Sequence, residues 1–308
     1  MKKIDLHLHT FFSDGEDSPR ELFNKIRKNN ISLFSICDHN YISPESIKIK
    51  KIAEEYNIVF LQGVEISCVD RATGESLHIL GYSHSFDLRK LNAFLQPIIA
   101  GYNRRAIKII KKLNAKYNGL NLDFDEMRLR KKEAYISRNT IACELMKFLG
   151  EESITLQEAL KETFVEESDS WMPDSKKAVR IIKDAGGVAI IAHPGRTAKN
   201  LTHNFEFLLK RLVKSGVIGL EAFYPKHDEQ MTAYFNNLGR QYGLVITAGS
   251  DWHGENYTHG RTIGFEIADY EYIKILEMVQ ITCKSKFISF PNRREPAFSN
   301  VKKLSIAH

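Results

Sequence analysis

Side chains that commonly bind metal ions follow short apolar segments along most of this chain. Lys3–His9 is predicted to be a strand that ends in the pair His7 and His9. Because side chains alternate along a strand, the two imidazoles of this pair lie on one face. Further candidates stand at or just past the ends of other predicted strands: His39, Glu65, His193, Asp251 and His253. In a parallel barrel of alternating strands and helices, those ends share one face, which brings residues distant in sequence together.

The predicted elements alternate on either side of a helical stretch. Strands are predicted at 3–9, 31–37, 58–66, 75–82, 188–192, 217–222, 244–248 and near 286–290. Helices begin after Ser18 and Ser43, where a capping serine precedes proline, and recur at 174–184, 206–215, 227–242 and near 270–280. From about Asn92 to Ser170, apolar residues recur every three or four positions, which is typical of helices. We predict an α/β barrel, residues 1–91 and 171–308, interrupted by a helical insertion, residues 92–170.

Composition and charge restrict the class of protein. The net charge of +6 favours anionic partners such as nucleotides, phosphosugars or RNA. No run of about 18 apolar residues occurs and no apolar signal region follows Met1, so we predict a cytoplasmic protein without membrane contact. The 4 cysteines are scattered, which favours free thiols. No sequence feature indicates an obligate protein partner.

The candidate ligands share a chemistry of imidazoles and carboxylates without thiolates. The full set is His7, His9, Asp14, His39, Glu65, His78, His193, Asp251 and His253. Such mixed sites suit Mn²⁺, Fe²⁺ or Zn²⁺. The set is too large for one ion and suffices for two or three. Ions held in this way turn water into hydroxide near neutral pH and clamp a phosphoryl group, so we predict phosphate-ester hydrolysis by a metal-bound hydroxide.

The motifs around these residues resemble those of the PHP (polymerase and histidinol phosphatase) superfamily. They are His7-Leu8-His9-Thr10 with Asp14, Cys37-Asp38-His39-Asn40, Gly63-Val64-Glu65, His78, Ala192-His193-Pro194-Gly195 and Gly249-Ser250-Asp251-Trp252-His253. The resemblance implies a distorted (β/α)₇ barrel with a trinuclear metal centre. It assigns His7, His9, Glu65 and Asp251 to the first ion. It assigns Glu65, His78 and His193 to the second, and Asp14, His39 and His253 to the third.

The insertion is similar to that of one PHP group, the 3′,5′-nucleotide bisphosphatases and 5′-to-3′ exoribonucleases. The similarity rests on residues 135–142 and on Arg196 after the His193-Pro194-Gly195 motif. It implies that Ser137, Arg138 and Arg196 bind substrate phosphates, since a guanidinium matches phosphate oxygens bidentately. The chain departs from the group after Arg138, where Asn139-Thr140 replaces the usual Pro-His or Thr-His.

The predicted catalytic residues are Asp251, His193, Arg138, Arg196 and His227, with His227 as a general acid or phosphate contact. The first-choice substrate is a 3′,5′-nucleotide bisphosphate such as pAp, or the 5′ end of a short RNA. The alternatives are a phosphatase or cyclic phosphodiesterase for a small phosphosugar, a histidinol phosphate phosphatase, and a non-catalytic polymerase-associated domain. The basic stretch 128–132 is predicted to be a solvated loop rather than an RNA-binding tract.

Overall fold

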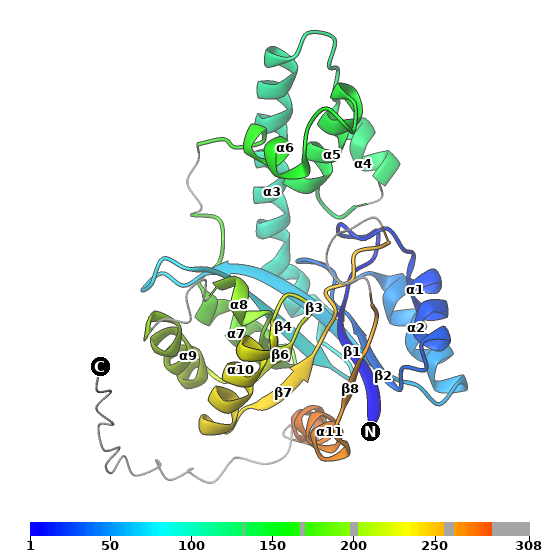
Figure 1. Cartoon of the computed structure of the whole chain (residues 1–308), viewed down its shortest axis with the longest axis vertical. Helices are drawn as coiled ribbons and strands as arrows, with labels where there is room; N and C mark the ends of the chain where they lie inside the picture. The colour runs from blue at the N-terminus through cyan, green and yellow to red at the C-terminus, as the bar shows by residue number, and fades with distance from the viewer. Residues whose placement is uncertain (132, 167–169, 198–202, 256–261, 285–308) are drawn as a thin grey trace.

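The computed structural model describes residues 1–131, 133–166, 170–197, 203–255 and 262–284. A curved sheet with helices around it forms the lower part of the molecule in Figure 1, and a helical projection rises above it. The strand predicted near 286–290 lies outside the described residues.

One eight-stranded sheet forms the barrel. Its strands are β1 (Lys2–Leu8), β2 (Leu33–Ile36), β3 (Val59–Val69), β4 (Ser76–Ser83), β5 (Val188–Ile191), β6 (Val217–Phe223), β7 (Val245–Ala248) and β8 (Phe265–Ile267). Their spatial order is β7-β6-β5-β4-β3-β2-β1-β8. A parallel bridge between Leu8 and Trp252 joins the end of β1 to the segment after β7, so the barrel is nearly closed. The predicted α/β barrel is confirmed, and β8, which runs antiparallel to β1, is an additional strand that was not predicted.

The strand directions explain how His78 reaches the same end of the barrel as the other candidates. β4 runs antiparallel to both of its neighbours, β3 and β5, whereas the pairs β1–β2, β2–β3, β5–β6 and β6–β7 are parallel. The start of β4 therefore lies beside the end of β3, where His78 pairs with Ser67, two residues beyond Glu65. His78, near the beginning of β4, thus lies with the candidate ligands that stand at the ends of the parallel strands.

Eleven helices are present among the described residues. They are α1 (Pro19–Lys28), α2 (Pro44–Glu55), α3 (Leu88–Lys116), α4 (Phe124–Lys131), α5 (Arg138–Leu149), α6 (Leu156–Glu162), α7 (Ser175–Asp184), α8 (Pro194–Thr197), α9 (His203–Ser215), α10 (Glu229–Gln241) and α11 (Asp269–Lys284). The predicted serine caps are confirmed, because Ser18 accepts from the Glu21 amide and Ser43 from the Glu45 amide. No helix in these described parts is long and apolar enough to span a membrane.

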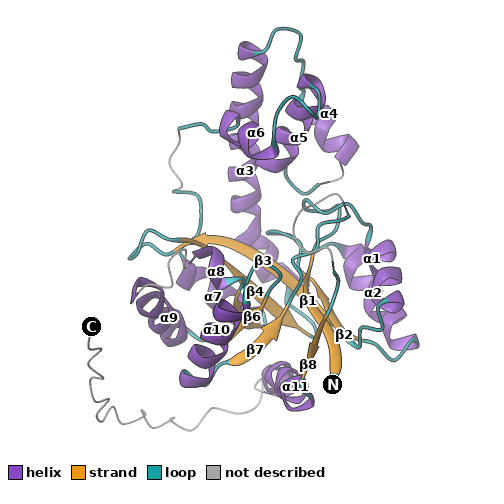
Figure 2. Ribbon diagram, in the orientation of Figure 1, coloured by secondary structure: helices purple, strands orange, loops and turns teal. Residues whose placement is uncertain are grey.

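The barrel interior is an apolar core that α11 closes at one end. Leu6, Leu61 and Ile190 are buried inside the barrel together with Ile275 and Met278 of α11. Figure 2 shows α11 at the end where β1 begins. Burial of each such side chain contributes about 1.5–3 kcal/mol, so this end supplies stability. The opposite end, formed by the carboxyl ends of the parallel strands, is left for polar groups.

Helix α3 connects the barrel to the helical projection. Its first turns bury Leu91 and Leu95 in the core between the sheet and α7. Its later turns bury Ile109 and Leu113 in a separate core with α5 and α6. The stretch predicted to be a solvated loop instead contributes 128–131 to helix α4. The division at residues 92 and 170 stays a prediction, with α3 crossing the first of these boundaries.

Candidate metal centre

The nine candidate ligands meet where the carboxyl ends of the parallel strands converge. Three groups of them have ligand atoms within 4.8 Å of one another: His7, His9, Glu65 and Asp251; His9, Asp14, His39 and His253; and His39, Glu65 and His78. The ninth, His193, contacts Glu65. The arrangement predicted from strand ends is therefore present in space.

Sharp backbone turns place some of these side chains. Asn40, His193 and Asp251 follow β2, β5 and β7 with φ values of 52°, 23° and 53°. Residues other than glycine rarely adopt positive φ, and such strain concentrates at functional sites. The three turns stand at or next to the candidate ligands His39, His193 and Asp251.

The first group combines residues from distant parts of the chain. His7 lies in β1, Glu65 in β3, and Asp251 in the turn after β7. Nε2 of His7 lies 3.1 Å from Glu65 Oε2 and 3.5 Å from Asp251 Oδ1. Nε2 of His9 lies 3.3 Å and 3.2 Å from the same two oxygens. All four side chains are buried. Two imidazole nitrogens and two carboxylate oxygens thus lie within 4.8 Å of one another.

Glu65 lies at the centre of the cluster. Its Oε1 is 2.6 Å from His78 Nδ1 and 2.9 Å from His193 Nε2. Its Oε2 is 2.9 Å from His39 Nδ1, in addition to its contacts with the first group. One carboxylate therefore belongs to two of the groups and could be shared by neighbouring ions.

The third group lies between the loop after β1 and the turn after β7. Asp14 Oδ1 is 3.2 Å from His253 Nε2 and 3.8 Å from His39 Nε2. The His9 ring stacks on the His253 ring at 4.2 Å between centroids, so this group adjoins the first.

Unpaired buried atoms show that the cluster fits cations. Four ligand atoms are buried and have no hydrogen-bond partner of acceptable geometry: His7 Nε2, His9 Nε2, Glu65 Oε2 and Asp251 Oδ1. Each of the two nitrogens nevertheless lies 3.1–3.5 Å from both oxygens. Two atoms bound to one ion at about 2.0–2.2 Å lie about 3.0–3.5 Å from each other. A buried polar atom without a partner is costly, and a shared cation satisfies all four at once.

Charge within the cluster shifts the pKa values in two directions. Burial by itself opposes ionisation of Glu65, but the imidazoles of His39, His78 and His7 hold its pKa well below the usual range. Burial likewise disfavours the charged form of His253, yet Asp14 and Asp251 raise its pKa to about 9. Without a metal, Glu65 is therefore an anion and His253 is protonated, whereas burial lowers the pKa of His193 to about 3 and keeps that imidazole neutral. A divalent cation would take the place of the protons on the charged imidazoles.

Glu221 is a functional candidate that the sequence reasoning missed. Its Oε1 is 3.0 Å from His7 Nδ1, and its Oε2 accepts from the His193 amide at 2.7 Å. It is fully buried in β6, where it is the sole acidic residue of the apolar segment Val217–Phe223. That isolated carboxylate was the available signal. A carboxylate behind a metal-binding imidazole fixes its tautomer and ring direction, so Glu221 orients Nε2 of His7 toward the cluster.

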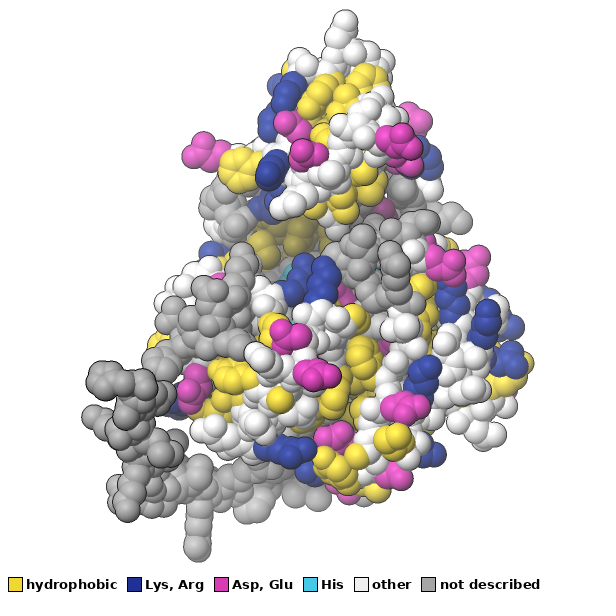
Figure 3. Space-filling view, viewed as in Figure 1, with side chains coloured by type: hydrophobic (Ala, Val, Ile, Leu, Met, Phe, Trp, Pro, Cys, Tyr) yellow, Lys and Arg dark blue, Asp and Glu magenta, His cyan; other side chains and the backbone are white. Residues whose placement is uncertain are grey.

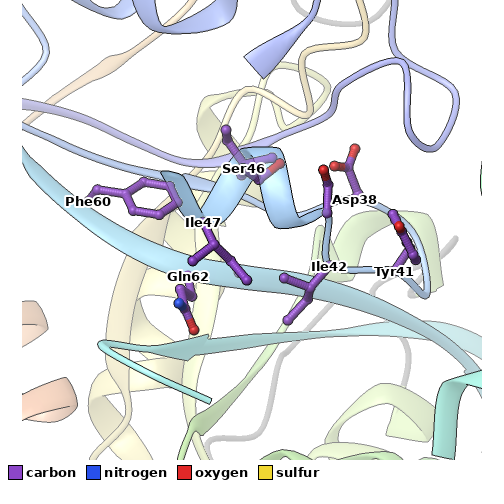
Figure 4. A pocket seen from close by; sticks show the side chains of 10 residues that line it. Asp38, Tyr41, Ile42, Ser46, Ile47, Phe60 and Gln62 are labelled. Atoms are coloured by element: carbon purple, nitrogen blue, oxygen red, sulfur yellow. The ribbon is translucent and has the colours of Figure 1, made fainter. Parts of the chain in front are cut away.

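The small pocket beside the rim is not part of this centre. It lies under the loop after β2, and Figure 4 shows Asp38, Tyr41, Ile42 and Gln62 around it. It leaves no room for a water molecule. The Asp38 carboxylate instead accepts from the amide and hydroxyl of Thr10, both at 2.7 Å, which ties the loop after β1 to the end of β2.

Arg196, a predicted phosphate contact, lies beside the centre and is partly exposed. It is in α8, and Nη1 lies 3.6 Å from Asp251 Oδ2 with the side chain 46% exposed. The Tyr224 hydroxyl donates to the same oxygen at 3.2 Å. Figure 3 shows Lys and Arg side chains gathered at the hollow below the helical projection. A cation that touches a candidate ligand and reaches solvent is well placed to meet an anionic substrate.

His227 occupies a different environment from the one predicted. Its Nδ1 is 2.8 Å from the Ala222 carbonyl, and its Nε2 accepts from the Gly195 amide at 3.1 Å. These partners assign the proton to Nδ1, so neither nitrogen has a proton available for a leaving group. These contacts argue against a general acid: His227 holds the loop after His193 in place, and its alternative role as a phosphate contact stays a prediction. Gly195 is required there because a Cβ would lie 2.7 Å from the imidazole.

Ser137 and Arg138 stand at the start of α5. The hydrogen bonds described below join them to other residues of the insertion. The Ser137 hydroxyl accepts from the Thr140 amide at 3.1 Å, as an N-cap. Arg138 donates from Nη2 to the Leu160 carbonyl at 2.6 Å and from Nε to Thr163 Oγ1 at 3.0 Å. The structure does not place this guanidinium among the candidate ligands, so its role with substrate stays a prediction.

Comparison with known proteins decides the family. The PHP domain model matches residues 5–164, which include the first six of the nine candidate ligands. The chain belongs to the PHP family.

The relatives of this PHP protein are phosphoesterases. A phosphoribosyl 1,2-cyclic phosphate 1,2-diphosphodiesterase of Eggerthella lenta is 25% identical over 85% of this chain and 98% of the relative. A 5′-3′ exoribonuclease of Haemophilus influenzae is 30% identical over 82% and 90% of the two chains. A 3′,5′-nucleoside bisphosphate phosphatase of Chromobacterium violaceum is 30% identical over 86% and 91%. A solved structure described as a metal-dependent phosphoesterase, from Bifidobacterium adolescentis, aligns with a TM-score of 0.74 and 25% identity over 89% of this chain and 96% of its own. This PHP protein is a metal-dependent phosphoesterase.

Proposed function

We propose that this phosphoesterase binds two or three Mn²⁺, Fe²⁺ or Zn²⁺ ions and hydrolyses phosphate esters of nucleotides. The proposed substrates are a 3′,5′-nucleotide bisphosphate, such as pAp, and the 5′ end of a short RNA. We also propose that it acts in the cytoplasm. The observation that carries the proposal is the convergence of the three candidate groups, with their unpaired buried atoms, around Glu65.

The three groups support more than one ion. Glu65 borders two of the three groups, and His9 and His39 each belong to two, so neighbouring ions would share ligands. Divalent cations held there would lower the pKa of a water molecule and neutralise the charge that develops on phosphoryl oxygens. Imidazole and carboxylate ligands suit Mn²⁺, Fe²⁺ or Zn²⁺ alike.

The residues at the opening would hold the substrate. Arg196 would bind phosphoryl oxygens, because its guanidinium is a fork of donors that already lies beside Asp251. Tyr224 donates to Asp251, and burial keeps its pKa raised, so its hydroxyl retains its proton and fixes the direction of that carboxylate. Glu221 would align His7 and the His193 amide from behind.

The nucleotide choice is supported by the combination of relatives and the insertion. Two relatives at 30% identity act on nucleotides or RNA by their names. In this chain, the link to α5 lies against the site, because the Ala134 amide donates to the Phe12 carbonyl at 2.8 Å and the Tyr135 hydroxyl is 3.5 Å from Asn40 Nδ2. The insertion thus borders the metal centre, where a substrate base or ribose would extend.

A second candidate substrate is a cyclic phosphodiester of a phosphosugar. It is favoured by the cyclic phosphodiesterase relative, which this chain matches over 98% of the relative's length. The same metal groups and Arg196 would serve both substrates, since each presents a phosphoryl group to the centre.

A substrate comparison tests the proposal. The Mn²⁺-loaded chain would be incubated with pAp, with a 5′-phosphorylated oligoribonucleotide and with ribose 5-phosphate 1,2-cyclic phosphate, and phosphate or nucleotide release would be measured. We expect pAp or the oligoribonucleotide to give a kcat/KM at least about 10-fold above the cyclic sugar, and the Asp251→Asn variant to lose at least about 100-fold on each. Preference for the cyclic sugar would replace the nucleotide proposal with the second candidate.

A further inference from the structure

Trp252 stands between two candidate ligands, Asp251 and His253, and its side chain reaches a neighbouring loop. The indole Nε1 donates to Asp17 Oδ2 at 2.8 Å. Both side chains are buried, with Trp252 5% and Asp17 8% exposed. A hydrogen bond from a neutral donor to a buried carboxylate is among the stronger kinds, so this contact fixes the indole relative to the loop.

The loop that Trp252 holds is the one that carries Asp14. Residues 9–17 and 252–254 are joined by backbone hydrogen bonds at two points: His9 N to the Trp252 carbonyl at 2.9 Å and Glu16 N to the His253 carbonyl at 2.8 Å. The indole bond to Asp17 is a third connection, made by side chains. The two segments therefore form one unit across the place where the barrel nearly closes.

A glycine makes the close approach of the two segments possible. Gly254 has a φ of +124°, and a Cβ there would lie 2.2 Å from the Glu16 carboxylate. The positive φ is a backbone conformation that residues with a Cβ rarely adopt, so glycine suits this turn between the segments.

The unit sets the geometry of the third group. Asp14 Oδ1 and His253 Nε2 lie 3.2 Å apart, one on each segment. Metal ions require their ligands within a few tenths of an ångström, and partners behind the ligands supply that constraint. Nothing else in the described residues donates to Asp17 Oδ2, while Lys25 Nζ pairs with the other oxygen at 2.9 Å.

We propose that Asp17 and Trp252 are positioning residues, whose hydrogen bond holds Asp14 and His253 at the separation that the third metal group requires. The inference rests on the proposed metal ligands. It gives the tryptophan a task that phenylalanine cannot perform, because phenylalanine fills the same apolar site among Leu8, Leu22 and Phe23 without donating a hydrogen bond.

Manganese binding by four variants tests the inference. Trp252→Phe removes the donor and keeps the ring, and Asp17→Leu removes the acceptor and keeps the size. Asp17→Asn keeps an oxygen that can accept from the indole. Lys25→Met removes the cation that lies 2.9 Å from Asp17 and 5.0 Å from the Trp252 ring centroid, without touching the indole N–H. Each full-length chain would be stripped of metal, shown to be folded by circular dichroism and titrated with Mn²⁺ by equilibrium dialysis.

We expect Trp252→Phe and Asp17→Leu to bind one of the Mn²⁺ ions about 10- to 100-fold less tightly than the wild type. The other Mn²⁺ sites should be unchanged, and Asp17→Asn and Lys25→Met should resemble the wild type. Wild-type Mn²⁺ binding by folded Trp252→Phe would overturn the inference alone, and equal losses in Asp17→Asn and Asp17→Leu would do the same. A wild-type chain that bound no Mn²⁺ would overturn the proposed metal centre as well. If Trp252→Phe did not fold, the pair of Asp17 variants would still decide.

Discussion

The rim of the barrel and the helical insertion were both expected to contribute to the site, but different interactions fix the positions of their side chains. At the rim, side chains separated by as many as 246 positions, from His7 to His253, lie together because strand ends converge. In the insertion, the side chain of Arg138 holds its own domain together through Leu160 and Thr163. Topology therefore fixes the position of a rim residue, whereas local packing fixes that of an insertion residue.

The difference assigns separate tasks to the two regions. The rim is buried, charge-balanced and closed around Glu65, which suits the chemistry. The insertion contacts the rim through Phe12 and Asn40 and surrounds its own small core, which suits the choice of substrate. Changes at the rim should abolish activity on every substrate, and changes in the insertion should alter preference or stability.

The largest effect is expected for Glu65→Gln. The amide cannot act as an anionic ligand, and it removes the carboxylate that contacts the imidazoles of His39, His78 and His193. We expect phosphoesterase activity to fall by at least about 100-fold together with loss of bound metal. Activity assays and metal analysis would measure both. The exposed Glu54→Gln in α2 is the control, and full activity of Glu65→Gln would remove the rim from the chemistry.

Arg196→Met is expected to lower kcat/KM by about 100-fold while metal content stays constant. The methionine keeps much of the volume but removes the donors beside Asp251. Steady-state kinetics on pAp and metal analysis of the same preparation would separate substrate binding from metal loss. An unchanged kcat/KM would show that the phosphate is held elsewhere, with the insertion as the next place to examine.

The Glu221→Gln variant should weaken Mn²⁺ binding by about 10- to 100-fold. The amide replaces one carboxylate oxygen with an NH₂ group, so either the His7 ring N–H or the His193 amide faces a donor instead of an acceptor. Equilibrium dialysis would measure the affinity, with exposed Glu266→Gln in β8 as the control. Equal affinities in the two variants would mean that the strand alone orients His7.

Much of the rim could be predicted because each candidate stands at a predictable place relative to a strand. Position at the ends of predicted strands and the motif resemblance indicated His7, His39 and Asp251. Glu221 was missed because its position within β6 looks like that of any core residue. The antiparallel direction of β4 could not be read from an alternating segment, although it is what brings His78 to the rim.

The fold class was predicted correctly, but two elements outside the rim, β8 and α4, were not predicted. β8 has only three residues, too few for a periodic pattern, and α4 has many charged residues and few apolar ones. The role of His227 depended on whether its nitrogens meet substrate or backbone, and that depends on the position of the Gly195 amide. Such contacts arise from tertiary packing, which a single sequence does not display.

The pH dependence of the metal-free protein should report the charge balance at the rim. The pKa of His253 is raised to about 9 by Asp14 and Asp251, against the opposing effect of burial. A raised pKa in the folded state stabilises the fold below the unfolded value of about 6.5, and that contribution is lost as pH rises to 9. We expect the melting temperature of the chelator-treated wild type to fall between pH 6.5 and 9, and to fall less in His253→Gln. Identical slopes would contradict the assigned charges.

The smallest effect on turnover is expected for Arg138→Met, because Arg138 donates to Leu160 and Thr163 within the insertion. The free energy of unfolding should drop by about 1 kcal/mol, because two hydrogen bonds between α5 and the end of α6 are lost. Chemical denaturation and pAp kinetics would be measured together. A loss of kcat/KM as large as that of Arg196→Met, with unchanged stability, would instead place Arg138 on the substrate and remove the contrast between the two regions.

The central claim is that the three groups around Glu65 are metal sites. Crystals grown with Mn²⁺ and measured for anomalous scattering test it directly. We predict two or three anomalous peaks, each within about 2.0–2.3 Å of atoms from one candidate group, with Glu65 next to at least one of them. Peaks only at other surface positions, or none at the rim, would contradict the account.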